Sequence, residues 1–131
     1  MTSWMWLDGR DARTIHERLL ALHRGAEGVR DIDLLESALA RPEQIAAYGA
    51  DPDVSDLAAA YTAGVVKNQP FIDGNKRASF VLGILFLEIN GWRFTASEEA
   101  ATRAVIDLAA GTMDMAGYAA FLRDHSTRES S

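Results

Sequence analysis

The sequence predicts an all-α fold in which about six helices pack around a central buried helix at about residues 75–90. Apolar residues recur at helical spacing in segments that glycine, proline or acidic residues separate. Residues 80–89 are apolar on nearly every face, which is typical of a helix surrounded by others. The length of 131 residues suits one domain, with a core from about 7 to 125 and a polar, frayed tail at 126–131.

The first helix is expected at about residues 8–24, with Asp8 as its N-cap, and two glycines follow it. A short second helix is expected at residues 31–40. It should stop before Pro42, because proline restricts the preceding residue to extended conformations. Residues 41–52 contain two prolines and a glycine without a sustained period, which predicts an irregular loop or a small hairpin.

The third helix should run to about residue 68, with Asp53 or Ser55 as its cap, and its many alanines let a neighbouring helix approach closely. The fourth begins at about Gly74 and ends at the stop signal Asn90-Gly91. Ser97 caps a fifth helix at 98–110, and an acidic residue at position 114 opens a sixth.

The composition, 48% apolar and 24% charged, is ordinary for a soluble globular protein. The absence of cysteine excludes disulfides and zinc-thiolate sites and fits a reducing compartment. A net charge of −6 argues against nucleic acid as the primary ligand, and fits either simple solubility or a basic partner segment. The longest apolar run, 80–87, is too short for a bilayer and the start lacks basic residues, so we expect a cytoplasmic protein.

The polar segment at residues 68–77 has the composition of a phosphate-binding loop that leads into a helix. A helix start offers unpaired N–H groups and a partial positive charge, which bind anions. Gly74 permits a close backbone approach, and Lys76 and Arg77 add positive charge.

Two further side chains of this segment suit a nucleoside triphosphate. Asn75 either orients the loop or donates to a phosphate oxygen, and Asp73 can hold Mg²⁺ together with phosphates. An ordinary surface turn before a helix has the same residue types, so their chemistry alone leaves both interpretations open.

Residues 69–77, Gln-Pro-Phe-Ile-Asp-Gly-Asn-Lys-Arg, closely resemble the Fic/Doc family signature His-x-Phe-x-(Asp/Asn)-(Gly/Ala)-Asn-Lys-Arg. The one departure is Gln69, which stands where the family carries its catalytic histidine. The resemblance covers about residues 7–125. It includes segments that look like the Doc-type (death-on-curing) branch, at residues 28–31, 34–42, 58–61 and 86–91.

The resemblance implies a Fic/Doc-like bundle that binds ATP and Mg²⁺, with a target-protein hydroxyl attacking the nucleotide. Gln69 occupies the position of the general base, and Asp73 that of the residue that holds the metal or orients the hydroxyl. The implied catalytic positions are Gln69, Asp73 and Arg77, and the implied phosphate-binding positions are Gly74, Asn75, Lys76 and Arg77.

Lys76 favours the Doc branch, because the AMP-transferring branch has glycine there. The resemblance therefore implies a toxin of a toxin–antitoxin system that transfers the γ-phosphate of ATP to a translation factor such as elongation factor Tu. Pro70 and Gly74 are nearer to the Fic consensus, which keeps AMP transfer as an alternative. A catalytically silent module that binds nucleotide or antitoxin is the third possibility.

The resemblance also assigns two regulatory features. Residues 41–52 match the family's flap, which holds the target segment beside the nucleotide. Residues 95–100 have the spacing of the family's inhibitory helix but the wrong last residue, so we expect restraint by a separate antitoxin that folds on binding.

Gln69 cannot act as a general base, and losing a positioned base costs about 100- to 10,000-fold in rate. Phosphate binding should survive. Three explanations remain: an engineered or selected inactivating change, a natural pseudoenzyme, or Asp73 as the base in a reaction that depends on positioning. The intact remainder of the motif favours the first and third.

Other polar residues are given structural interpretations. His16 and His23, on the first helix, are interpreted as packing or surface residues, and His125 as unimportant. Arg30 and Asp31 are interpreted as a structural salt bridge or a helix cap.

Overall fold

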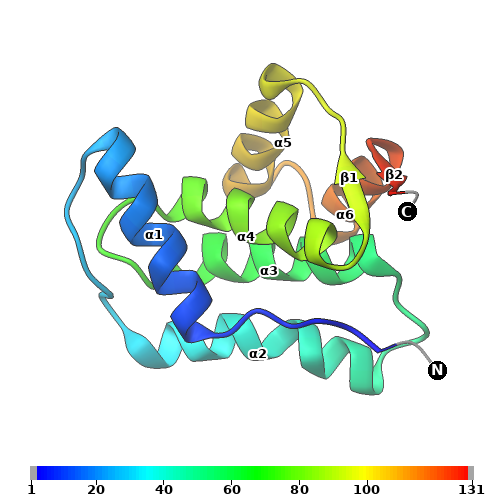
Figure 1. Cartoon of the computed structure of the whole chain (residues 1–131), viewed down its shortest axis with the longest axis horizontal. Helices are drawn as coiled ribbons and strands as arrows, with labels where there is room; N and C mark the ends of the chain where they lie inside the picture. Colours follow the sequence, from blue (N-terminus) through cyan, green and yellow to red (C-terminus); the bar gives the residue numbers. More distant parts are fainter. Residues whose placement is uncertain (1–2, 130–131) are drawn as a thin grey trace.

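The computed structural model describes residues 3–129 as six helices and one two-stranded antiparallel sheet, which confirms the all-α prediction (Figure 1). The elements in chain order are α1 (Gly9–His23), α2 (Ile32–Tyr48), α3 (Val54–Asn68), α4 (Asn75–Ile89), β1 (Trp92–Phe94), α5 (Glu98–Ala110), α6 (Met115–Asp124) and β2 (Ser126–Arg128).

Side-chain caps fix the start of five helices. In each case an Asp or Ser accepts a hydrogen bond from the backbone N–H three residues on, which satisfies one of the helix's unpaired donors. The caps are Asp8, Asp31, Asp53, Ser97 and Asp114. The helix starts predicted from these residues are therefore confirmed, and Asp53 rather than Ser55 caps α3.

The prediction that residues 41–52 form a loop was wrong. The second helix continues through Pro42 to Tyr48, and the irregular stretch begins only at Gly49. Pro42 lacks an N–H and removes one helical hydrogen bond. Its ring is buried, however, and the apolar stripe of α2 continues past it to Ile45, so core burial offsets the lost bond.

The centre of the bundle is shared between α3 and α4, which lie side by side in Figure 1. Ten of the 15 residues of α3 are buried, against six of 15 in α4, so α3 is the more enclosed of the two. Small residues make this possible, as the sequence predicted: a Cβ on Gly64 would lie 3.3 Å from Ala38 of α2. The motif segment connects these two central helices.

The small sheet joins the chain's last described residues to the turn after α4. Trp92 pairs with Arg128 and Phe94 with Ser126, and the Arg128 guanidinium lies 5.8 Å from the Trp92 ring centre. The prediction of a frayed tail was therefore wrong for residues 126–128, while residues 130–131 lie outside the described part of the chain. Within residues 3–129, no helix has the length and apolar character needed to cross a membrane.

Two buried tyrosines predict a loss of stability in alkaline solution. Burial raises the pKa of Tyr61 and of Tyr118 to about 12, whereas in an unfolded chain the pKa is about 10. Between those pH values the unfolded chain has released protons that the folded protein retains. Each tyrosine should therefore lower the free energy of unfolding by about 1.4 kcal/mol per pH unit as the pH rises from about 10 to about 12.

Urea denaturation at a series of alkaline pH values measures this slope. The control is Tyr118→Phe, because the Tyr118 hydroxyl lies near Thr62 without a well-formed hydrogen bond, so the variant removes mainly the titrating proton. The variant should show about half the slope of the parent protein. An unchanged slope would exclude Tyr118 as one of its sources.

Candidate active site

Gln69 lies at the C-terminus of α3, in the left-handed backbone region (φ 47°, ψ 57°), with its side chain exposed. Its N–H donates to the Val65 carbonyl at 2.9 Å. A non-glycine residue in this region is uncommon, and histidine, asparagine and aspartate are the types that tolerate it best. The backbone at position 69 therefore suits the histidine of the family signature.

Arg30 holds this end of α3 from outside the motif. Its Nε donates to the Gln69 carbonyl and its Nη2 to the Asn68 carbonyl, both at 3.0 Å. A cation at a helix C-terminus also interacts favourably with the helix dipole. Asp31 caps α2 by accepting from the Leu34 N–H at 3.0 Å, so the helix-cap interpretation is confirmed for Asp31, and Arg30 caps a different helix end.

The segment that lies beside the motif is the connection between α1 and α2, residues 24–31. The Pro70 carbonyl accepts hydrogen bonds from the N–H groups of Arg30 (2.7 Å) and Asp31 (3.1 Å), and the Ile72 N–H donates to the Gly28 carbonyl at 3.1 Å. Val29 and Phe71 form an isolated antiparallel bridge. The resemblance led us to expect residues 41–52 beside the motif, but the α1–α2 connection lies there instead.

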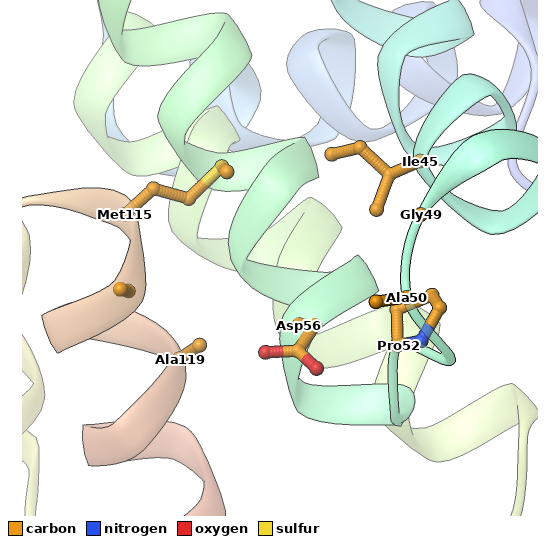
Figure 2. A pocket seen from close by; sticks show the side chains of 8 residues that line it. Ile45, Gly49, Ala50, Pro52, Asp56, Met115 and Ala119 are labelled. Atoms are coloured by element: carbon orange, nitrogen blue, oxygen red, sulfur yellow. The ribbon is translucent and has the colours of Figure 1, made fainter.

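Residues 49–52 lie at the other end of α3. Three of them, Gly49, Ala50 and Pro52, line an open pocket of about 250 Å³ between the α2 C-terminus and α6, together with Asp56 near the start of α3 (Figure 2). The pocket's lining residues are Ile45, Gly49, Ala50, Pro52, Asp56, Met115, Ala116 and Ala119. Since a helix of 15 residues spans roughly 20 Å, this segment cannot act as a flap beside the motif.

Asn75 uses both ends of its amide to fix the motif loop. Its Oδ1 accepts from the Phe71 N–H and its Nδ2 donates to the Phe71 carbonyl, both at 3.0 Å. The Phe71 ring is 1% exposed and anchors the loop in the core. Of the two roles that the sequence left open for Asn75, this geometry favours orienting the loop.

Asp73 lies at the turn into α4 with an exposed side chain. Its Oδ1 accepts from the Gly74 N–H at 2.8 Å, and its carbonyl accepts from His16 Nε2 at 2.7 Å. Gly74 itself has a φ of +77°, which glycine adopts without strain. The second carboxylate oxygen, Oδ2, makes no hydrogen bond within the described residues.

The N-terminus of α4 differs from those of the other five helices because no side chain caps it. Lys76 and Arg77 in its first turn are exposed, and within residues 3–129 neither forms an ion pair. Unpaired N–H groups, the helix dipole and two cations make this helix start suited to an anion such as a phosphate.

The residues present also fit a magnesium ion that arrives with a nucleotide. The described residues contain no cluster of three or more histidine and carboxylate side chains able to hold a metal alone. Mg²⁺ in nucleotide sites is held by one or two carboxylates plus substrate phosphates, and Asp73 supplies one carboxylate beside the α4 N-terminus.

Comparison with known proteins agrees with this helix bundle and its loop. The chain belongs to the Fic/Doc family, whose pattern matches residues 6–87. A curated relative, "Toxin Doc" of Mycolicibacterium smegmatis, is 38% identical over 104 residues, covering 70% of this chain and 78% of the relative.

The structure adds three residues to the site that sequence reasoning did not assign to it. They are His16 and Arg30, which hydrogen-bond to the motif backbone, and Gly25, which lies against Asp73. His16 carried a usable signal, because a polar side chain on the apolar face of a helix needs a buried partner. The other two depend on how the α1–α2 connection folds back, which local pattern does not specify.

Gly25→Ala should disturb Asp73 selectively. An added Cβ would lie 2.9 Å from Asp73 Oδ2 and 3.1 Å from Leu20 Cδ2, so the flexible carboxylate must move. In a catalytically competent Gln69→His background we expect transfer from ATP to fall about 10- to 100-fold, because a small displacement of a positioned group has effects of this size.

Gly28→Ala is the matched control for this prediction. Gly28 also has a positive φ, +109° against +143° for Gly25, so both substitutions strain the backbone. A Cβ on Gly28 would meet only the tip of Ile72, at 3.2 Å. Equal losses of transfer in the two variants would attribute the effect to backbone strain and contradict a role of the Asp73 carboxylate.

Proposed function

We propose that this protein is a Doc-type toxin that transfers the γ-phosphoryl group of ATP to a hydroxyl of a target protein, at a rate that Gln69 lowers. The observation that carries the proposal is the uncapped α4 N-terminus, where Lys76 and Arg77 are exposed in the turn that follows Asp73. Membership of the Fic/Doc family and similarity to a protein named Toxin Doc support the assignment.

In the proposed reaction the target hydroxyl oxygen forms a bond to the γ-phosphorus while the bond to the β–γ bridging oxygen breaks, which releases ADP. The N–H groups of the first turn of α4, with Lys76 and Arg77, hold the phosphates and stabilise their charge. Mg²⁺ would supply further charge neutralisation, with Asp73 as its protein ligand. In this proposal Asp73 also accepts the hydroxyl proton, and an Oδ2 without a hydrogen bond within residues 3–129 supports that role.

Gln69 can orient the attacking hydroxyl by hydrogen bonding but cannot take its proton. Phosphoryl transfer with Asp73 as the only base should therefore be slow, whereas nucleotide binding should be retained. The α1–α2 connection, residues 24–31, lies along the motif loop. We therefore assign the role of the flap, which holds the target segment, to this connection and not to residues 41–52.

The proposed partners follow from the family. The protein substrate is a translation factor of the elongation factor Tu type, and a separate antitoxin protein restrains the toxin by folding along it. AMP transfer is the second candidate reaction, and Pro70 and Gly74, which are nearer to the Fic consensus, favour it.

Labelled ATP distinguishes these reactions. The wild-type protein and the Gln69→His variant are each incubated with cell lysate and Mg²⁺, once with γ-labelled and once with α-labelled ATP. Protein labelling from γ alone supports phosphoryl transfer, and labelling from α shows AMP transfer instead. If both forms bind ATP but neither labels any protein, the protein is a silent binding module and the proposed function is wrong.

A further inference from the structure

We propose that His16, on α1 and outside the motif, is a positioning residue that fixes the Asp73 carbonyl and thereby the turn into α4. Its structural effect is independent of the reaction, and its effect on catalysis rests on the proposed function. His16 lies outside the family signature, 53 to 61 residues before positions 69–77 of the chain.

The contacts of His16 involve two different parts of the motif loop. The side chain is buried, with 3% exposed, and its Nε2 lies 2.7 Å from the Asp73 carbonyl oxygen. The imidazole ring stacks on the Phe71 ring at a centroid distance of 4.0 Å and an interplanar angle of 8°. Because a carbonyl oxygen only accepts hydrogen bonds, Nε2 must carry a proton, and this contact defines the tautomer of the neutral ring.

The rest of the motif loop has other anchors, whereas the Asp73 carbonyl depends on His16. Asn75 holds Phe71, and the α1–α2 connection holds Pro70 and Ile72. Within residues 3–129 no other donor bonds to the Asp73 carbonyl. The peptide between Asp73 and Gly74 also passes close to the ring, since a Cβ on Gly74 would lie 3.7 Å from His16 Nε2.

The position of this peptide matters because it joins the proposed catalytic carboxylate to the proposed phosphate site. Its carbonyl side belongs to Asp73, and its N–H side belongs to Gly74, the N-cap of α4. A rotation of the peptide would move the Asp73 side chain relative to the first turn of α4. A histidine that only filled space in the core would leave this rotation unrestrained.

Two substitutions separate the hydrogen bond from the packing of the ring. His16→Gln keeps an N–H donor at about the place of Nε2 but removes the stacked ring, and His16→Phe keeps a stacked ring but removes the donor. Both are made in the Gln69→His background. We expect His16→Phe to lower kcat about 100-fold, the effect of misplacing a reacting group, and to leave ATP binding without Mg²⁺ nearly unchanged. His16→Gln should retain kcat within about tenfold of its parent.

Amide hydrogen exchange supplies a measurement that does not depend on activity. The Gly74 N–H is bonded to Asp73 Oδ1, and its exchange should rise about tenfold in His16→Phe but not in His16→Gln. Equal behaviour of the two variants, in kcat and in exchange, would show that His16 acts through packing alone and would overturn the proposal. If Gln69→His transfers nothing, the proposed function fails, while the exchange comparison still tests His16.

Nitrogen NMR of the wild-type protein tests the same contact without a substitution and so without risk to folding. The expected result is a His16 ring whose Nε2 carries the proton. A neutral ring with its proton on Nδ1 would overturn the proposal, because Nε2 could not then donate to the Asp73 carbonyl.

Discussion

Replacing Gln69 with histidine is expected to raise the rate of transfer from ATP to the target protein by about 100- to 10,000-fold, the usual contribution of a positioned general base. The backbone supports this substitution, because position 69 is a left-handed C-cap that histidine tolerates, and the side chain there is exposed. Residues 70–77 already match the rest of the family signature, so this substitution restores the signature in full.

The measurement is the initial rate of label transfer at saturating ATP, as a function of pH. The rate of Gln69→His should rise through the titration of the new histidine, near pH 6.5 for an unperturbed ring. The control is Gln69→Ala, which also replaces the amide but supplies no base, and we expect it to remain at or below the wild-type rate. A rate for Gln69→His equal to that of Gln69→Ala would show that base catalysis at this position is not what limits transfer.

Replacing Gly83 with alanine should destabilise the whole bundle, by about 1–3 kcal/mol in the free energy of unfolding. A Cβ on Gly83 would overlap Thr62 Oγ1 and lie 3.1 Å from the Ala58 carbonyl oxygen, at the contact between α3 and α4. The Thr62 hydroxyl donates to the Ser79 carbonyl at 2.8 Å, and both residues are buried. The substitution therefore crowds the core and strains a buried hydrogen bond.

In urea denaturation this effect appears as a lower midpoint concentration of urea, while the slope of the free energy of unfolding against urea concentration stays unchanged. Gly9→Ala is the matched control, because Gly9 is also helical and a Cβ there meets no atom within 4 Å, so alanine should stabilise the protein by up to about 1 kcal/mol. Adding Thr62→Ala should reduce the cost of Gly83→Ala, since the two side chains compete for one space. If the two substitutions change the free energy of unfolding additively, crowding between these two side chains is not the cause of the destabilisation.

The helix boundaries were largely predictable because they depend on local chemistry. Caps such as Asp8, Asp53 and Ser97 act within one turn, so neighbouring residues are enough to locate them. Pro42 misled the prediction, because the burial that keeps α2 helical beyond it comes from other helices. The strands β1 and β2 were missed because three residues give no recognisable period, and their pairing is non-local.

The candidate site likewise has a part that was predictable from the sequence and a part that depends on long-range packing. The residue types at positions 69–77, the resemblance they carry and the lack of a general base at Gln69 are all visible in the sequence. The side chains that hold this segment from outside could be identified only from the folded structure. Arg30 bonds to the end of α3, His16 to the Asp73 carbonyl, and Gly25 lies against the Asp73 carboxylate.

The difference arises because local and long-range interactions depend on different parts of the chain. The motif consists of consecutive residues, and Asn75 fixes part of it locally. The side chains that hold it from outside lie 38 to 57 residues away along the chain, and they meet it only after α1 and the α1–α2 connection have packed. Side-chain hydrogen bonds and ring stacking act over a few ångströms of space, irrespective of separation in sequence. The sequence therefore determined which chemistry the loop carries, and the packing of α1 decided how that loop is held.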